Sequence, residues 1–255
     1  YSLRAQNELR ANRIEGYLQD NWHFKTGTDS VPTLYTLNYG VRFSHWSFNG
    51  ETLLSPRVSL NILPGWNRNL AFRLATGLYY QAPFYKELRD TTTINSVTYA
   101  NLNHKIRAQR SVHFVGSMDY NFRMLNRPFK FSAEFYYKML SRLTPYVVDN
   151  VKVTYFGDKE ATGHAAGIDL KLFGEFVPET TSWLTFSLMS TRMQLDGKSI
   201  PLPTDQRYAV NLFFTDYFPG TTKWRMSLRL AFADGLPFSA PHKELEYNTF
   251  RAPAY

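Results

Sequence analysis

The feature that most constrains this chain is a strict alternation of apolar and polar residues, sustained over unusually long runs. From Val112 to Phe122 every second residue is apolar or glycine, and most of the residues between them are polar. Trp224 to Phe232 repeats the pattern. A strand points successive side chains to opposite faces, so each run predicts a strand with one apolar and one polar face. Further runs cover 14–24, 35–48, 57–63, 69–80, 131–139, 167–177, 183–195 and 206–218.

The length of the runs indicates a membrane. They span about 8–14 residues, whereas globular strands average about 5–6 and tilted membrane strands need about 9–11. The longest uncharged stretch, from Thr180 to Thr191, is too short for a membrane helix, which needs roughly 20 residues. A mean hydropathy of −0.37 suits a barrel, because alternate residues face a polar lumen. We predict an all-β fold, an antiparallel transmembrane β-barrel of which this chain supplies about ten strands.

The connections between runs alternate between short and long, with the second as the exception. Short turns on one rim and longer loops on the other are typical of the periplasmic and outer ends of an outer-membrane barrel. Tryptophans near the short turns, such as Trp22, Trp183 and Trp224, predict a belt at the membrane interface. The shorter set, each with a proline, is 25–34, 64–68, 123–128, 178–182 and 219–223, and the other set is 49–56, 81–108, 140–166, 196–205 and 233–255.

The charged residues predict a wet interior rather than a nucleic-acid surface. Net charge is +8, but lysines and arginines are scattered singly instead of forming one stripe. The absence of cysteine excludes disulfides and cysteine metal sites. An open sheet edge in hydrocarbon is costly, so we expect an incomplete barrel that needs at least one more strand. The side chains expected to face its lumen or a plug are Arg42, Arg57, Arg73, Asp119, Glu134, Lys138, Asp169, Lys171, Glu175, Arg225 and Arg229.

Several short motifs, in their order, resemble the C-terminal half of a TonB-dependent outer-membrane receptor of the kind common in Bacteroides-like bacteria. The strand Gly-Tyr-Leu-Gln-Asp-Asn-Trp at 16–22 is similar to the family's Gln-Asp-x-Trp strand. The others are Asn-Tyr-Gly-Val-Arg-Phe at 38–43, Leu-Ser-Pro-Arg at 54–57, Gly-Leu-Tyr-Tyr-Gln-Ala-Pro at 77–83 and the glycine-to-acid stretch 163–169.

The resemblance implies about 22 strands around an N-terminal plug. Residues 1–255 would then be the C-terminal part of the barrel domain, with the plug, the TonB box and the final strand outside this chain. The first strand would be roughly the twelfth and would run down into a short turn. The resemblance also implies an outer-membrane location, contact with lipid and lipopolysaccharide, and a TonB complex acting through the plug. The ligand could be a ferric chelate, haem, a vitamin or an oligosaccharide.

No catalytic motif is present, neither Gly-x-Ser-x-Gly nor a P-loop nor His-Glu-x-x-His, and we expect no enzyme, resident metal or cofactor. His104, His164 and His242 fall in expected outer loops, where they could contact a metal chelate or only solvent. A passive porin and, with less support, a surface enzyme stay open beside active import.

The loop 81–108 is the best candidate for ligand capture, because aromatic rings offer stacking surfaces and basic groups bind anions. The bland alternative is a loop that contacts lipopolysaccharide or water. The candidate ligand-binding residues of loop 81–108 are Phe84, Tyr85, Lys86, Arg89, Tyr99, His104, Lys105 and Arg107.

Overall fold

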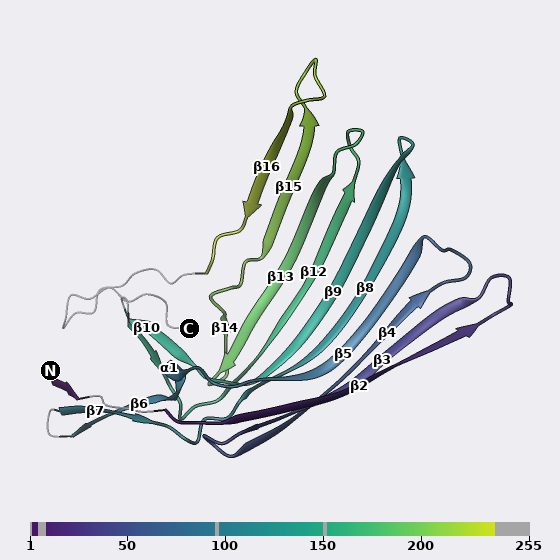
Figure 1. Ribbon diagram of the computed structural model, residues 1–255. Helices are drawn as coiled ribbons and strands as arrows, with labels where there is room; N and C mark the ends of the chain where they lie inside the picture. Colours follow the sequence, from purple (N-terminus) through teal and green to yellow (C-terminus); the bar gives the residue numbers. More distant parts are fainter. Residues whose placement is uncertain (1, 5–8, 95–96, 150–151, 238–255) are drawn as a thin grey trace.

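The structure is a computed structural model that describes residues 2–4, 9–94, 97–149 and 152–237. Its main feature is one curved, open sheet of 11 strands, ten of them long (Figure 1). In the described residues, no helix has the length and apolarity of a membrane span. The sheet is antiparallel, and its edge strands, β2 and β16, do not pair with each other in this part of the chain. The predicted all-β, antiparallel fold is confirmed.

The ten long strands form what we call the wall. They measure 9 to 17 residues and each pairs with the next one along the wall, as expected for meandering membrane strands. Their bounds are β2 Arg13–Thr26, β3 Thr33–Trp46, β4 Glu51–Leu63, β5 Leu70–Gln81, β8 Gln109–Met124, β9 Arg127–Leu143, β12 Ala161–Gly174, β13 Ser182–Leu195, β15 Tyr208–Tyr217 and β16 Arg225–Ala233.

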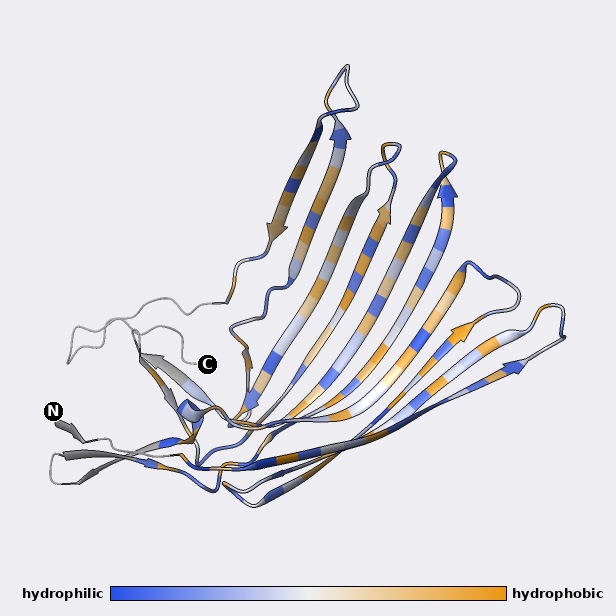
Figure 2. Ribbon diagram, viewed as in Figure 1, coloured by the Kyte–Doolittle hydropathy of each residue, from blue (hydrophilic) through white to orange (hydrophobic). Residues whose placement is uncertain are grey.

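The pairing register divides the wall into two faces, because directly opposed residues on neighbouring strands share a face. Gly116 opposes Phe135, and Phe135 opposes Ile168, on what we call the apolar face. Glu134 opposes Asp169 on the polar face. Figure 2 shows the resulting alternation of hydrophobic and hydrophilic residues along each strand. The polar face carries Arg42, Arg57, Arg73, Glu134, Asp169, Lys171, Arg225 and Arg229.

The two ends of the wall differ in their connections. Segments 27–32, 64–69, 125–126, 175–181 and 218–224 are plain turns at one end (Figure 1). Leu125 and Asn126 both have positive φ, as in the two-residue hairpins that match strand twist. At the other end lie the structured elements, which are β1 Ser2–Arg4, α1 Tyr85–Leu88, β6 Arg89–Ile94, β7 Val97–Leu102, β10 Tyr146–Asp149, β11 Lys152–Tyr155 and β14 Lys198–Pro201.

The sequence-based prediction was wrong at the start of β4, at the connection before it, and at both ends of β12. Strand β4 begins at Glu51 rather than at 57, and the connection before it is the turn 47–50. Pro56 lies within this strand, and pairing with β5 starts only at Arg57, so the missing amide of Pro56 costs no hydrogen bond on that side. Strand β12 begins at Ala161, where alanine and glycine hide the alternation, and it ends at Gly174, which leaves Glu175 outside the strand.

Two individual placements also need correction. Trp183, predicted for the membrane belt, opposes Phe213 on the polar face, and the Lys171 Nζ lies 5.9 Å from its ring. An aromatic ring near the mouth of a barrel can equally pack on the wet side when a cation covers it. His164, predicted for an outer loop, lies within β12, where it opposes Met139 on the apolar face.

Candidate functional site

The segment 82–108 and the turn 47–50 form a small apolar core at the structured end. Trp46 from β3 and Phe48 from the turn pack with Leu88 and Ile106 from the segment, and all four are buried. This core attaches the segment to the wall at the end of the polar face. Sequence analysis predicted the segment as one loop, whereas it contains α1 and the β6–β7 hairpin.

Glu51 joins the turn 47–50, the segment 82–108 and the end of strand β9. One carboxylate oxygen accepts hydrogen bonds from the Ala108 amide at 2.8 Å and from the Asn49 side chain at 3.3 Å. The other accepts one from the Arg142 guanidinium at 3.2 Å. The Glu51 side chain is 14% exposed, so water screens these charges little. Sequence analysis missed Glu51 because it placed this residue in a loop.

A hollow of about 450 Å³ opens where the segment meets the wall. Arg42 and Arg57 line it from the polar face, and Pro83 and Phe84 line it from the segment. The lining also includes Glu15, which pairs with Arg42, and Glu51, so charges of both signs and an aromatic side chain meet there.

The predicted ligand-binding residues divide into two groups. His104 stacks on Phe48 at 4.1 Å between ring centres, and its Nδ1 donates to the Phe48 carbonyl at 2.9 Å. Arg107 donates to both carboxylate oxygens of Glu160, at 2.8 and 3.0 Å. These contacts hold the connections together in this conformation. Arg89 is half-buried at the start of β6, and Lys105 is exposed.

Phe84, Tyr85 and Lys86 form the second group, on and just before α1. All three are exposed, with Phe84 at 62%. These three residues are consecutive, and among the described contacts their side chains form none like those that engage His104 and Arg107. As ligand contacts, the whole predicted set remains a prediction. The side chain of Tyr99 and all of His242 lie outside what the structure describes.

Helix α1 also contains a buried carboxyl group, that of Glu87, which sequence analysis did not single out. It is 6% exposed and accepts hydrogen bonds from the Phe84 amide at 2.9 Å and the Gln109 side chain at 3.2 Å. Burial raises the pKa of Glu87 above its ordinary value, and the two hydrogen bonds oppose that rise. Burial, together with the charge of Glu87, also raises the pKa of Tyr155.

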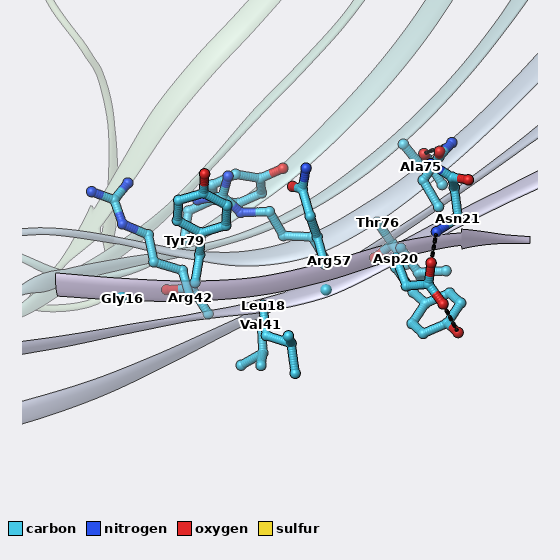
Figure 3. Close-up of a pocket in the computed structure, with 18 of the residues that line it drawn as sticks. Gly16, Leu18, Asp20, Asn21, Val41, Arg42, Arg57, Ala75, Thr76 and Tyr79 are labelled. Carbon is cyan, nitrogen blue, oxygen red and sulfur yellow. Dashed lines mark hydrogen bonds between the residues drawn. The ribbon is translucent and has the colours of Figure 1, made fainter.

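A larger hollow of about 900 Å³ lies along β2 to β5. Figure 3 shows Arg42, Arg57 and Tyr79 rising on one side of the sheet, while Leu18 and Val41 point to the other. Arg42 forms an ion pair with Glu15, whereas the Arg57 guanidinium lies over the Tyr79 ring, 4.4 Å from its centre. The wall therefore carries cationic and aromatic groups together on its polar face.

Within the described ranges, no three histidine or carboxylate side chains gather as a possible metal site. The side chains of this end can recognise a ligand by charge, hydrogen bonding and stacking.

Comparison with known proteins identifies the family. The family described as TonB dependent receptor-like, beta-barrel, matches residues 2–255. No curated protein and no solved structure matches the chain. The match covers nearly the whole sequence and agrees with the antiparallel wall, its two faces and its two unlike ends. The chain therefore belongs to the TonB-dependent receptor β-barrel family, a family of outer-membrane receptors and transporters.

Proposed function

We propose that this chain is part of the barrel of a receptor that imports a specific ligand across the outer membrane with TonB-derived energy. One observation supports this most strongly, namely a wall of long strands with one apolar face and structured segments at only one end. In this proposal the apolar face meets lipid, and the polar face lines the lumen and meets the plug. The TonB complex acts through that plug, and lipopolysaccharide surrounds the outer rim.

The structured end is the proposed side of ligand capture. The exposed side chains of Phe84, Tyr85 and Lys86 would make the first contacts, and the hollow behind Phe84 leads onto Arg42 and Arg57. The ligand class is a ferric chelate, haem, a vitamin or an oligosaccharide.

A passive porin is the second candidate, and a surface enzyme is a more distant one. The packing of segment 82–108 against the polar end of the wall favours import over free diffusion, because it places a folded segment beside the entrance. Swelling of liposomes that contain the full-length receptor, in arabinose, tests the porin directly. We expect no swelling, and rapid swelling would establish a passive pore.

The orientation of the wall can be tested by labelling single cysteines in intact cells, because this chain has no cysteine of its own. Lys86→Cys on α1 should react with a membrane-impermeant maleimide added outside. Arg68→Cys, exposed in the turn 64–69 at the opposite end, is the matched control and should react only after the cells are opened. The reverse pattern would contradict the proposed orientation.

Coupling to TonB needs a separate measurement on the full-length receptor. We expect the purified periplasmic domain of TonB to bind it, and import to stop when the proton-motive force is collapsed. Import that continues without that force would contradict active transport.

A further inference from the structure

Three basic residues, Arg57, His113 and Lys138, lie in one row of directly opposed residues across the polar face, which we call the rung. The register aligns Gly40 with Arg57, Arg57 with Gly77, Gly77 with His113, and His113 with Lys138. Neighbouring strands lie about 4.8 Å apart, so Arg57 and His113 originate about 10 Å apart and Lys138 about 5 Å further on. A short row of basic groups therefore crosses strands β4 to β9 at one height.

Glycine gives the first of these groups its room. A Cβ atom on Gly77 would lie 3.1 Å from the Arg57 Cγ and 3.0 Å from the Tyr79 ring. The absence of that atom lets the guanidinium settle over Tyr79, whose ring also stacks on His113 at 4.2 Å between centres. Arg57, Tyr79 and His113 thus form one packed cluster rather than a set of independent side chains.

The far end of the rung repeats this arrangement. The Tyr136 hydroxyl lies against Gly167, where a Cβ atom would approach it to 2.4 Å. The Lys138 Nζ lies 5.3 Å from the centre of the same ring. At each end of the rung, a cation therefore lies beside a tyrosine ring that packs against a glycine: Arg57 beside Tyr79 and Gly77, and Lys138 beside Tyr136 and Gly167.

The positive charge of the rung lacks a carboxylate partner. Among the described residues, no ion pair involves Arg57, His113 or Lys138. Glu15 is engaged with Arg42. Glu134, on the strand of Lys138, and Asp169, opposite Glu134 on β12, share this face, but each originates four residues from the rung, about 13 Å along the strand. The rung is therefore poised to bind negative charge from elsewhere.

We propose that Arg57, His113 and Lys138 form a binding site for a small ligand that carries two or three carboxylate or phosphate groups. The proposal rests on the proposed function, since the polar face must line the ligand's path. Arginine binds such groups through two parallel hydrogen bonds, and lysine adds a point charge. Arg57 and Lys138 originate about 15 Å apart with His113 between them, and their long side chains leave room for several anionic groups of one small molecule.

Calorimetric titration of the purified full-length receptor tests this site. Citrate and tripolyphosphate are the probes, each at ionic strength held constant with chloride, and they distinguish carboxylate from phosphate. We expect saturable binding of at least one probe. Arg57→Gln and Lys138→Gln should each weaken it about tenfold, because each removes a charge-assisted hydrogen bond. Arg73→Gln removes a cation of the same face that bonds Asn61, and it should leave binding unchanged.

A second pair of variants keeps the charge and changes the geometry. Gly77→Ala should weaken binding by displacing Arg57 and Tyr79. Gly116→Ala, on the apolar face, brings a Cβ only to 3.6 Å from Leu74 and should not. Absence of binding to both probes, or equal weakening by Arg73→Gln, would overturn the proposal. Detergent-solubilised receptor needs neither membrane nor TonB for this measurement, so its failure is distinguishable from failure of the labelling and uptake tests.

Discussion

Large apolar side chains are exposed on the wall and buried at the structured end. On the apolar face Phe135 and Leu228 are 53% and 51% exposed, whereas Leu88 and Ile106 in segment 82–108 are 1% and 5% exposed. The same types of residue are thus exposed in one part of the molecule and buried in the other. The difference indicates two solvents, with acyl chains around the wall and water around segment 82–108.

The largest test of this comparison is Leu228→Lys in β16. A cation on the lipid side of a midplane site should cost about 2–4 kcal/mol of folding free energy. Urea titration of the full-length receptor in phospholipid vesicles measures it. Ser227→Lys is the matched control, one residue away on the polar face beside Thr215, and should change stability little. Equal effects of the two lysines would contradict the assignment of the faces.

At the structured end, Glu51→Gln should loosen the connections that this carboxylate joins. Loss of the partly buried ion pair with Arg142 and weakening of the bond to the Ala108 amide should cost about 1–3 kcal/mol locally. Hydrogen–deuterium exchange should become faster in segment 82–108 and stay unchanged in β8. Asp29→Asn, which removes an exposed ion pair with Lys25 at the opposite end, is the control. Unchanged exchange in 82–108 would show that Glu51 holds nothing there.

A smaller and pH-dependent effect is expected from Glu87 in α1. Its pKa is higher in the folded segment than in the unfolded one, because burial disfavours the charged form. The folded segment therefore binds the proton more tightly, and its stability is greatest below the ordinary pKa of 4.5. Stability should fall as pH rises from there through the raised pKa and then level off. Limited proteolysis of 82–108 across this range should show the fall, and Glu87→Gln should remove it.

The smallest effect is expected from Arg107→Gln. Both side chains of its ion pair with Glu160 are about half exposed, so water and salt screen the attraction. Local stability should change by about 0.2–1 kcal/mol, less at high salt, as measured by the same exchange experiment. A loss as large as that of Glu51→Gln would mean that this pair is far less hydrated than its exposure implies.

Sequence reasoning succeeded where one rule governs a whole strand. Strands β8 and β16 were predicted nearly to their ends, because each keeps its alternation throughout. It was wrong at the start of β12, where Ala165, Ala166 and Gly167 give no contrast between faces. It missed the small elements of the structured end, because the conformation of these few residues depends on contacts with distant parts of the chain.

The candidate site divides in the same way. The alternation of Arg57 and Lys138 with apolar neighbours was enough to assign them to the polar face. Nothing in the sequence indicated that they share a rung with His113, because that depends on the register of four strands. Nor could the sequence show that His104 and Arg107 are engaged by Phe48 and Glu160.

The amino-acid sequence by itself determined the all-β class, the two faces of each strand and the family. These follow from local alternation and short motifs, which need no knowledge of neighbouring strands. The tertiary structure alone decided the strand register, the packing of segment 82–108 on the wall and the alignment of three basic groups between glycines. Each of these features brings together residues that are tens of positions apart in the chain. The stability of such contacts depends on distances in space, which no local sequence pattern encodes.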